Sequence, residues 1–185
     1  MTHGSSASAQ IRPAEDGDLE AITAIYGYHV RCGTASFETE PPTVEEMRRR
    51  RATLLDRGYP YLVAERDGVV IGYAYASNYH SRAAYRDTVE NSIYLDPDAI
   101  GQGVGSGLMA NLIAACEACG FRQMVAIIGD SANIHSVKLH ERHGFSLIGT
   151  LRSVGYKHGR WLDTIIFQRK LGFGDSEPPR LRMSD

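Results

Sequence analysis

Four glycines alternate with other residues in the segment Gly101-Gln102-Gly103-Val104-Gly105-Ser106-Gly107. The segment follows residues typical of a strand and opens a run typical of a helix. Glycine permits positive φ angles and close approach of the backbone to a ligand, and the first amides of a helix have no partner within it. Those amides and the helix dipole favour a bound phosphate. The turn therefore predicts a phosphate-binding site; the alternative is a glycine-rich connection without a ligand.

The spacing of these glycines excludes two common phosphate-binding motifs. A Walker A loop requires GxxxxGK[ST], and no lysine follows Gly105 or Gly107. The dinucleotide fingerprint GxGxxG fails because its last glycine falls on Ser106 or Leu108, depending on where the count begins. Both motifs usually follow the first strand of a unit, whereas this turn follows the fourth strand that we expect. The phosphate thus belongs to another class of ligand.

An acidic residue, Glu90, interrupts the otherwise uncharged strand predicted from Thr88 to Leu95. An acid at this place must face solvent, a partner or a cavity. In a cavity, burial raises the pKa of a carboxyl group toward neutrality and suits it to general base catalysis. The alternative is an ordinary glutamate on the exposed face of a strand.

The histidines and cysteines do not predict a metal site. His135, His140 and His143 are five and three residues apart, so they form no i, i+4 pair, and no carboxylate ligand accompanies them. Cys116-x-x-Cys119 falls near the end of a helical pattern, whereas a redox pair gains its low thiol pKa at a helix start. His140 has an unperturbed pKa close to neutral and is either a proton-transfer group or a residue of the helix surface.

Hydrophobic periodicity and capping signals predict the elements that position these residues. Asp16 or Asp18 is expected to cap the first helix, and Thr43 with Glu46 matches a capping box for the second. Strands are expected at 10–13, 61–66, 69–78, 88–95, 123–128, 146–156 and 161–170, and helices near 19–29, 43–56, 104–119 and 133–143. Hairpins mixed with strand–helix–strand crossovers predict an α/β fold with a mixed sheet covered by helices.

The composition is that of one globular domain. The chain has 185 residues, 43% of them hydrophobic, and a formal net charge of −2. We expect a domain at 10–172, a flexible leader at 1–9 and a flexible tail at 173–185. No concentrated basic surface predicts nucleic-acid binding, and no apolar run approaches the ~20 residues of a membrane span. The first ten residues lack the features of a signal peptide, so a cytoplasmic location is expected.

The glycine turn resembles the pyrophosphate loop of the GNAT superfamily, whose members transfer acetyl from acetyl-CoA to an amine. Gly103 and Gly105 match the glycines of its pattern Q/R-x-x-G-x-G/A, while Ile100 stands at the Gln or Arg position. Residues 133–145 resemble the second signature, N-x-x-A-x-x-φ-Y-x-x-x-G-F, with His140 at the usual tyrosine. The resemblance implies the GNAT acyl-CoA N-acyltransferase fold. Its twisted mixed sheet has about six to seven strands, carries helices on both faces, and splays near Ile93 to Leu95 to admit acetyl-CoA.

Further blocks narrow the resemblance to the phosphinothricin N-acetyltransferases, whose relatives act on methionine sulfoximine and methionine sulfone. The blocks begin at Phe37, Tyr61, Ser81, Thr88 and Gly155, and the likeness covers about residues 10–172. Several separated blocks in the same order are more specific than one glycine turn.

This resemblance implies roles for individual residues. Glu90 is implied as the base, and His140 as a group that protonates the leaving thiolate or tunes Glu90. Arg82, otherwise a solvated loop charge, becomes a candidate for gripping the acceptor's acidic end, with Phe37 and Tyr85 as walls. The implied acceptor site is Phe37, Glu38, His80, Ser81, Arg82, Tyr85, Glu90, Asn91 and Ser92, with Glu38 at the acceptor's amino group. The implied acetyl-CoA site is Ile93, Tyr94, Leu95, Gly101, Gln102, Gly103, Val104, Gly105, Ser106, Asn133 and Ser136, with no metal.

The expected mechanism is direct attack of the acceptor amine in a ternary complex. The three cysteines lie outside the matching blocks, so no acyl-enzyme nucleophile is expected. A homodimer is implied by the resemblance alone. Three alternatives stay open: another small amine or a peptide N-terminus as acceptor, a non-catalytic acyl-CoA-binding module, and a regulatory interaction protein. The residues do not distinguish the physiological acceptor, nor a herbicide-resistance role from a metabolic one.

Overall fold

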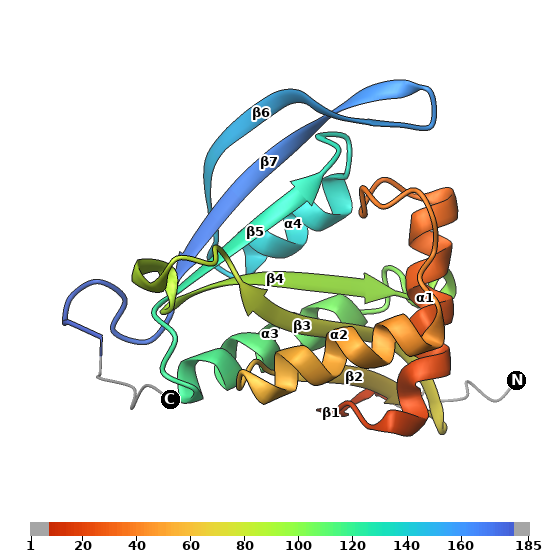
Figure 1. Ribbon diagram of the computed structural model, residues 1–185, viewed down its shortest axis with the longest axis horizontal. Coiled ribbons are helices and arrows are strands. Elements are labelled where there is room, and N and C mark those ends of the chain that lie inside the picture. The colour runs from red at the N-terminus through yellow and green to blue at the C-terminus, as the bar shows by residue number, and fades with distance from the viewer. Residues whose placement is uncertain (1–7, 180–185) are drawn as a thin grey trace, which may run out of the picture.

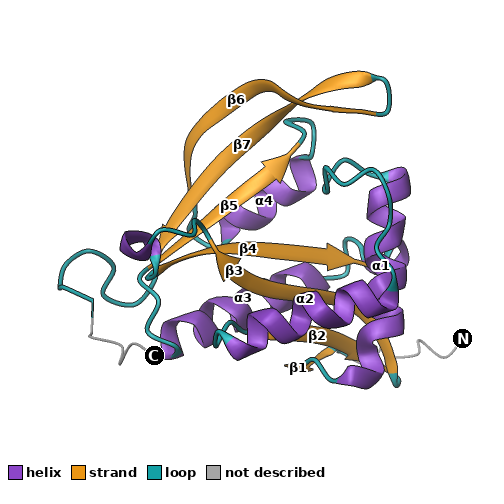
Figure 2. Ribbon diagram, in the orientation of Figure 1, coloured by secondary structure: helices purple, strands orange, loops and turns teal. Residues whose placement is uncertain are grey.

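The structure is a computed structural model that describes residues 8–179. In this part of the chain, four α-helices and three short 3-10 helices accompany one seven-stranded sheet (Figures 1 and 2). The strands are β1 (Gln10–Pro13), β2 (Tyr61–Arg66), β3 (Val69–Asn78), β4 (Thr88–Leu95), β5 (Gln123–Gly129), β6 (Ser146–Lys157) and β7 (Arg160–Lys170). The helices are η1 (Asp16–Asp18), α1 (Leu19–Cys32), α2 (Val44–Asp56), η2 (Ala83–Tyr85), η3 (Pro97–Ala99), α3 (Val104–Ala118) and α4 (Ile134–Arg142). The predicted mixed α/β fold is confirmed.

The sheet is mixed and splits in its middle. Its strand order is β1-β2-β3-β4-β5-β7-β6, and only β4 and β5 run parallel. These two strands pair from Thr88 with Gln123 to Asn91 with Ala126 and then diverge, while β3 continues beside β4 as far as Leu95. Figure 1 shows the resulting wedge between β4 and β5. The splay predicted near residues 93–95 therefore begins at Ser92.

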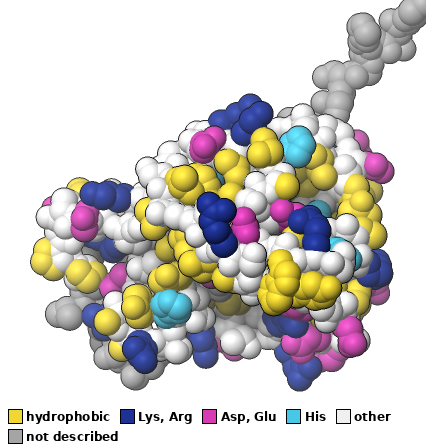
Figure 3. Space-filling view, turned by 90° about the horizontal axis from the view of Figure 1, so that it is seen from above, with side chains coloured by type: hydrophobic (Ala, Val, Ile, Leu, Met, Phe, Trp, Pro, Cys, Tyr) yellow, Lys and Arg dark blue, Asp and Glu magenta, His cyan; other side chains and the backbone are white. Residues whose placement is uncertain are grey.

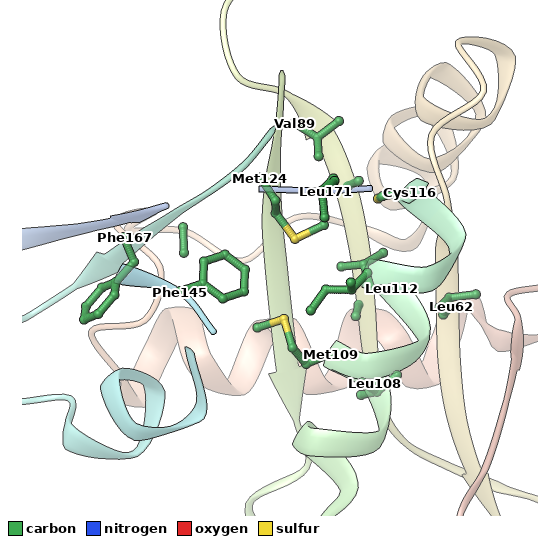
Figure 4. Close-up of a cluster of buried hydrophobic side chains, with 14 of the residues drawn as sticks. Leu62, Val89, Leu108, Met109, Leu112, Cys116, Met124, Phe145, Phe167 and Leu171 are labelled. Carbon is green, nitrogen blue, oxygen red and sulfur yellow. The ribbon is translucent and has the colours of Figure 1, made fainter. Parts of the chain in front are cut away.

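Successive side chains of the strands point to opposite faces of the sheet and belong to two hydrophobic cores, one on each face. Leu62 and Ala64 of β2 join the core beneath α3, whereas Tyr61 and Val63 of the same strand join the core beneath α1 and α2. Figure 4 shows Leu108, Met109 and Leu112 of α3 directed at the strands. The helices thus cover both faces.

The start of α2 matches its predicted cap in one half only. Thr43 Oγ1 accepts a hydrogen bond from the Glu46 amide at 3.2 Å, as predicted. The Glu46 carboxylate does not return to Thr43, because it forms ion pairs with Arg49 and Arg50 one turn further along the helix.

Asp18 stands at the predicted N-cap position of α1, but its side chain does not cap this helix. A short 3-10 helix, η1, precedes α1. Within it, Asp18 accepts hydrogen bonds from the Arg12 guanidinium at 2.8 Å and from the Glu15 amide at 2.7 Å. The Asp16 carboxylate pairs with Arg48 and Arg51 of α2. Both carboxylates therefore join elements together instead of satisfying the first amides of α1.

The two chain ends are described in part. Residues 1–7 of the expected leader and 180–185 of the expected tail lie outside the described residues. Within the described part, the Arg122 guanidinium donates hydrogen bonds to the carbonyl groups of Gly174 and Glu177 at 2.9 and 2.7 Å. Its guanidinium carbon also lies 5.7 Å from the centre of the Phe173 ring. No helix within residues 8–179 is long and apolar enough to cross a membrane.

Candidate functional site

A cavity of about 490 Å³ lies where β4 and β5 separate. The end of β4, the glycine turn, the second half of β5 and helix α4 line it. Twelve of the residues that we predicted as functional meet here, namely Asn91, Ser92, Ile93, Tyr94, Leu95, Gly101, Gly103, Gly105, Ser106, Asn133, Ser136 and His140. The splay thus assembles segments that are distant in the sequence.

The glycine turn forms an open N-terminus for α3. Gly101 and Gly103 have φ angles of 80° and 83°, a left-handed conformation that glycine adopts without strain. Gly103 is the N-cap residue of α3, so no side chain caps the first amides of the helix. Gly105 differs from these two, since a Cβ atom there would make only ordinary van der Waals contact with Leu95, at 3.4 Å. The turn therefore presents backbone donors at the cavity.

Side chains of the turn contribute little to this surface. Gln102 bonds to the Asp98 carbonyl and to Arg66, and Val104 is buried in the core beneath α3. Ser106 Oγ lies 2.8 Å from Nε2 of His143. Ile100, which replaces the expected polar residue, is 45% exposed at the lip of the cavity. Binding of an anion here depends on amides, so this replacement leaves the cradle intact.

Helix α4 presents Asn133, Ser136 and His140 to the cavity. Asn133 caps the helix, since its Oδ1 accepts a hydrogen bond from the Ser136 amide at 3.2 Å. His140 is buried, with Nδ1 2.7 Å from the Ser136 carbonyl oxygen and Nε2 3.1 Å from Oδ1 of Asn91. Burial lowers the pKa of His140, although the Ser136 carbonyl opposes that shift. Burial therefore favours the neutral form of the ring, whose Nδ1 lies against the Ser136 carbonyl and whose Nε2 lies against Asn91.

Asn91 and Glu90 occupy opposite faces of β4, because successive side chains of a strand alternate. Asn91 is buried on the α4 side, beside His140 and 3.5 Å from the Val125 carbonyl. Asn91 is one of the residues predicted for the acceptor site, but in the structure it lines the cavity beside the glycine turn. Glu90 instead shares its face with Ser92 and Tyr94.

Glu90 is half-buried beside an aromatic cluster on the α1–α2 face. It pairs across the sheet with Ser77, and Tyr75 and Tyr94 both lie within electrostatic range of its carboxylate. No hydrogen bond or ion pair joins its carboxylate to another side chain of residues 8–179. Burial alone raises the pKa of Glu90 to about 7. A carboxylate with such a pKa is suited to accept a proton at neutral pH.

A second cavity, of about 560 Å³, opens on this same face, between α2 and strands β2 and β3. Tyr26, Tyr61, Tyr73 and Tyr75 line it together with Ser77, the cross-strand neighbour of Glu90. This second cavity thus lies on the face of the sheet that carries Glu90, and its strand residues come from β2 and β3.

The predicted acceptor residues form two separate groups. Phe37 and Glu38 lie on the α1–α2 loop, where Glu38 accepts hydrogen bonds from Tyr26 at 2.9 Å and Arg50 at 2.7 Å. Because these donors already engage Glu38, the structure gives less support to a contact with the acceptor's amine.

The other group is His80, Ser81, Arg82 and Tyr85, all exposed on the segment between β3 and β4. His80 and Tyr85 contact each other with ring centres 5.0 Å apart. Figure 1 shows this segment and the α1–α2 loop at opposite ends of β4. The structure therefore does not bring Phe37 and Arg82 together within one chain.

Three site residues were not predicted. His29 of α1 donates a hydrogen bond from its Nε2 to the Leu95 carbonyl oxygen at 2.7 Å, at the open end of β4. His143 contacts Ser106, and Tyr75 lies beside Glu90. Of the three, only Tyr75 could have been inferred from the sequence, because it lies in the strand predicted beside the one that carries Glu90. In the structure Tyr75 pairs with Ser92, on the same face of the sheet as Glu90.

Neither histidines nor cysteines gather into a metal site. Among the described residues, no three His, Cys, Asp or Glu side chains are placed to hold a metal ion together. Cys116 is buried in the core beneath α3, where burial raises the pKa of its thiol to about 12, and Cys119 is exposed at the helix end. The Cys116 thiol therefore lacks the low pKa of a redox cysteine.

Known proteins resemble this chain over most of its length. Residues 11–166 match the model of the acetyltransferase (GNAT) domain. A phosphinothricin N-acetyltransferase of Alcaligenes faecalis is 57% identical over 169 residues, which cover 91% of this chain and 86% of the relative. An L-methionine sulfoximine/L-methionine sulfone acetyltransferase of Pseudomonas aeruginosa is 39% identical over 172 residues, covering 92% and 99%. A crystal structure of a phosphinothricin acetyltransferase from Sinorhizobium meliloti in complex with AcCoA superimposes with a TM-score of 0.91 at 47% identity, covering 94% of each chain.

We predict that Glu90 titrates near neutrality in the folded protein. Its pKa of about 7, against 4.5 for an ordinary glutamate, means that the folded state holds this proton more tightly than the unfolded state. The free energy of unfolding should therefore fall as the pH rises between these two values. In Glu90→Gln this part of the decrease should vanish. Urea denaturation at several pH values tests this, and identical profiles for both proteins would contradict the raised pKa.

Proposed function

Because the chain belongs to the GNAT acetyltransferase family, we propose that it transfers the acetyl group of acetyl-CoA to the amino group of a small amino-acid-like acceptor. The observation that carries this proposal is the position of Glu90, a carboxyl group with a pKa of about 7 at the point where β4 and β5 separate. The acceptor classes named for the two relatives support the choice of substrate.

The cavity at the splay has the donors that acetyl-CoA requires. Acetyl-CoA supplies an acetyl group activated as a thioester. The open amides of Gly101 to Ser106 would hold its pyrophosphate, as at other helix N-termini. The edge of β4 from Ser92 to Leu95 has no β5 partner, so its backbone can pair with the pantetheine arm and polarise the thioester carbonyl. Asn133 and Ser136 line the path of that arm.

Glu90 removes a proton from the acceptor's amino group, directly or through water. Its carboxylate has no side-chain partner within residues 8–179 and is ionised in about half the molecules near pH 7. His140 contacts both the Ser136 carbonyl and Asn91, and burial disfavours its charged form, so its proposed role is to orient Asn91 and α4.

The proposed acceptor class is phosphinothricin, methionine sulfoximine or methionine sulfone. These molecules combine an amino group with an acidic or strongly polar end. The Arg82 guanidinium forms no ion pair in the described chain and is free to bind such a group. The proposed walls of the acceptor site are Ser92 of β4, with His80, Ser81 and Tyr85 beyond one end of this strand and Phe37 beyond the other.

The test of the function combines binding with turnover. We predict that calorimetry detects acetyl-CoA binding and that thiol release requires one of the proposed acceptors, with ordinary amino acids and short peptides as comparison. Glu90→Gln should bind acetyl-CoA unchanged and lose about 10²–10⁴-fold in kcat. In the wild type, kcat/KM for the acceptor should rise with pH up to about 7, and this limb should disappear in the variant.

Each unfavourable result of this test has a distinct meaning. Absence of acetyl-CoA binding would overturn the proposal altogether, and binding without turnover would indicate an acyl-CoA-binding module. Activity confined to peptides would overturn the acceptor class. Unchanged turnover in Glu90→Gln would exclude Glu90 as the base.

We predict that Arg82→Ala raises KM for acidic acceptors about tenfold, because a charge-assisted hydrogen bond is lost. KM for acetyl-CoA should stay within about twofold, since Arg82 does not line that cavity. Arg57→Ala, at an exposed arginine at the end of α2, serves as the control for loss of charge. Equal effects of Arg82→Ala on both substrates would contradict an acceptor-binding role.

A homodimer is proposed from the surface of β6. This strand is an edge of the sheet and exposes Leu147, Ile148, Leu151, Val154 and Tyr156, each by about half or more. Figure 3 shows apolar side chains gathered over the face seen from above. An unpaired edge with exposed apolar side chains favours association. A second copy of the chain suits it, because the same patch on both subunits is complementary to itself in a two-fold interface.

We predict that Leu151→Asp combined with Val154→Asp converts a dimer to a monomer, since it places charge in the proposed interface. Sedimentation velocity at micromolar concentration measures the change. Val69→Asp is a matched control, because Val69 is 60% exposed but lies on the β2–β3 hairpin. A monomeric wild type, or a double variant that stays dimeric, would contradict this interface.

A further inference from the structure

Lys157, at the end of β6, carries a buried charge for which the proposed chemistry has no use. The residue is 6% exposed, and its Nζ donates a hydrogen bond to the Ser36 carbonyl oxygen at 2.6 Å. Burial lowers the pKa of this amine, while Glu38 opposes the shift. A buried ammonium group is costly unless it is paired, so its retention at this place indicates a specific task.

Ser36, whose carbonyl oxygen accepts the hydrogen bond from Lys157, is the centre of a polar network. Ser36 Oγ lies 2.8 Å from the Tyr26 hydroxyl and accepts a hydrogen bond from the Glu38 amide at 3.2 Å. Tyr26 in turn donates a hydrogen bond to the Glu38 carboxylate, which also accepts one from the Arg50 guanidinium. The network joins β6, α1, the α1–α2 loop and α2, so the Lys157 ammonium closes it from the side of the sheet.

The same segment places the Phe37 ring against two glycines. A Cβ atom built on Gly155 would lie 2.2 Å from this ring, and one built on Gly129 would lie 2.8 Å from it. Any side chain at either position would therefore displace Phe37. Gly155 is two residues from Lys157, so one stretch of β6 provides both the space for the ring and the charge that anchors its backbone.

Further contacts fasten the start of the loop to the β6–β7 hairpin. His158 Nε2 lies 3.2 Å from the Gly33 carbonyl oxygen. Thr34 donates a hydrogen bond to Asp130 at 3.1 Å, and Arg160 of β7 pairs with the same carboxylate at 2.5 Å. The loop has no helix or strand of its own between residues 33 and 43, so these side chains determine its conformation.

We propose that Lys157 is a positioning residue for the acceptor: its ammonium group holds the Ser36–Glu38 segment against the β6–β7 hairpin and thereby fixes Phe37 at the wall of the acceptor site. The kinetic part of this proposal rests on the proposed function. The structural part, which concerns the order of the loop, does not. Lys157 does not line the cavity at the splay, and of residues 33–43 only Ala35 lines it, so acetyl-CoA binding should depend on Lys157 much less than acceptor binding does.

Hydrogen–deuterium exchange of Lys157→Met tests the structural part without any substrate. Methionine keeps the apolar length of the side chain and removes the charge that binds the Ser36 carbonyl. Amides of residues 33–38 should exchange at least about tenfold faster, while those of α3 stay unchanged. Lys170→Met, at an exposed lysine of β7, is the matched control and should leave both regions as in the wild type. Unchanged exchange at 33–38 in folded Lys157→Met would overturn the proposal.

Steady-state kinetics tests the link to the acceptor. In Lys157→Met, KM for the acceptor should rise about tenfold, whereas the Kd for acetyl-CoA stays within about twofold. Lys157→Arg keeps a charged donor and should restore much of the acceptor affinity. Equal weakening of both substrates would show a general loss of structure and would overturn the positioning role.

A second variant keeps the proposal testable if Lys157→Met does not fold. Gly155→Ala pushes Phe37 away from the same stretch of β6 without changing Lys157. It should produce the same split, with a higher acceptor KM and unchanged acetyl-CoA binding. An acceptor KM equal to that of the wild type would exclude Phe37 as the element that Lys157 positions. If no acceptor is turned over by the wild type, the proposed function fails, and the exchange experiment still decides the role of Lys157.

Discussion

The early end of the pairing between β4 and β5 is the constraint on which this site depends. Two parallel strands that continued together beyond Asn91 and Ala126 would satisfy the backbone of residues 92–95 and leave no space between them. Their separation leaves one edge of β4 open and creates the cavity of about 490 Å³. The same geometry brings the N-terminus of α3 to the end of β4. Backbone donors and a free strand edge consequently share one cleft.

The two-residue period of β4 then separates the chemistry onto two faces. Glu90 faces the tyrosines under α1 and α2, whereas Asn91 faces His140 of α4. A shift of the register by one residue would exchange these faces and place the carboxylate among α3 and α4. The tyrosine face excludes water from Glu90 without offering it a cation, and this explains why burial alone raises its pKa to about 7. One strand can therefore present a base to the acceptor and a polar network to the opposite cavity.

Regular elements could be predicted from the sequence because their signals are local. The strand and helix ranges follow from periodicity, and the glycine turn follows from its spacing. The residues Ile93, Tyr94 and Leu95, which line the cavity, were instead implied by the family resemblance. The start of α1 was predicted at the right residue, but the partners of the Asp18 carboxylate were not, because Arg12 lies on a separate strand. The side of the sheet on which Asn91 acts could not be predicted either, since its buried partner His140 lies on α4. Lys157 gave no local signal, because its partner is 121 residues away.

The two sides of the site use different kinds of groups, and this difference bears on substrate choice. The side of the glycine turn depends on amides held by regular structure, which explains why Ile100 can replace a polar residue without closing the cradle. The acceptor side depends on side chains from irregular segments, among them Phe37, whose place is set by glycines and a buried charge on β6. Substitutions in those segments alter the shape and charge of the acceptor pocket while leaving both hydrophobic cores untouched. Related enzymes with one fold can thus share a co-substrate site and still differ in the amine that they accept, because the cost of each change is confined to loops.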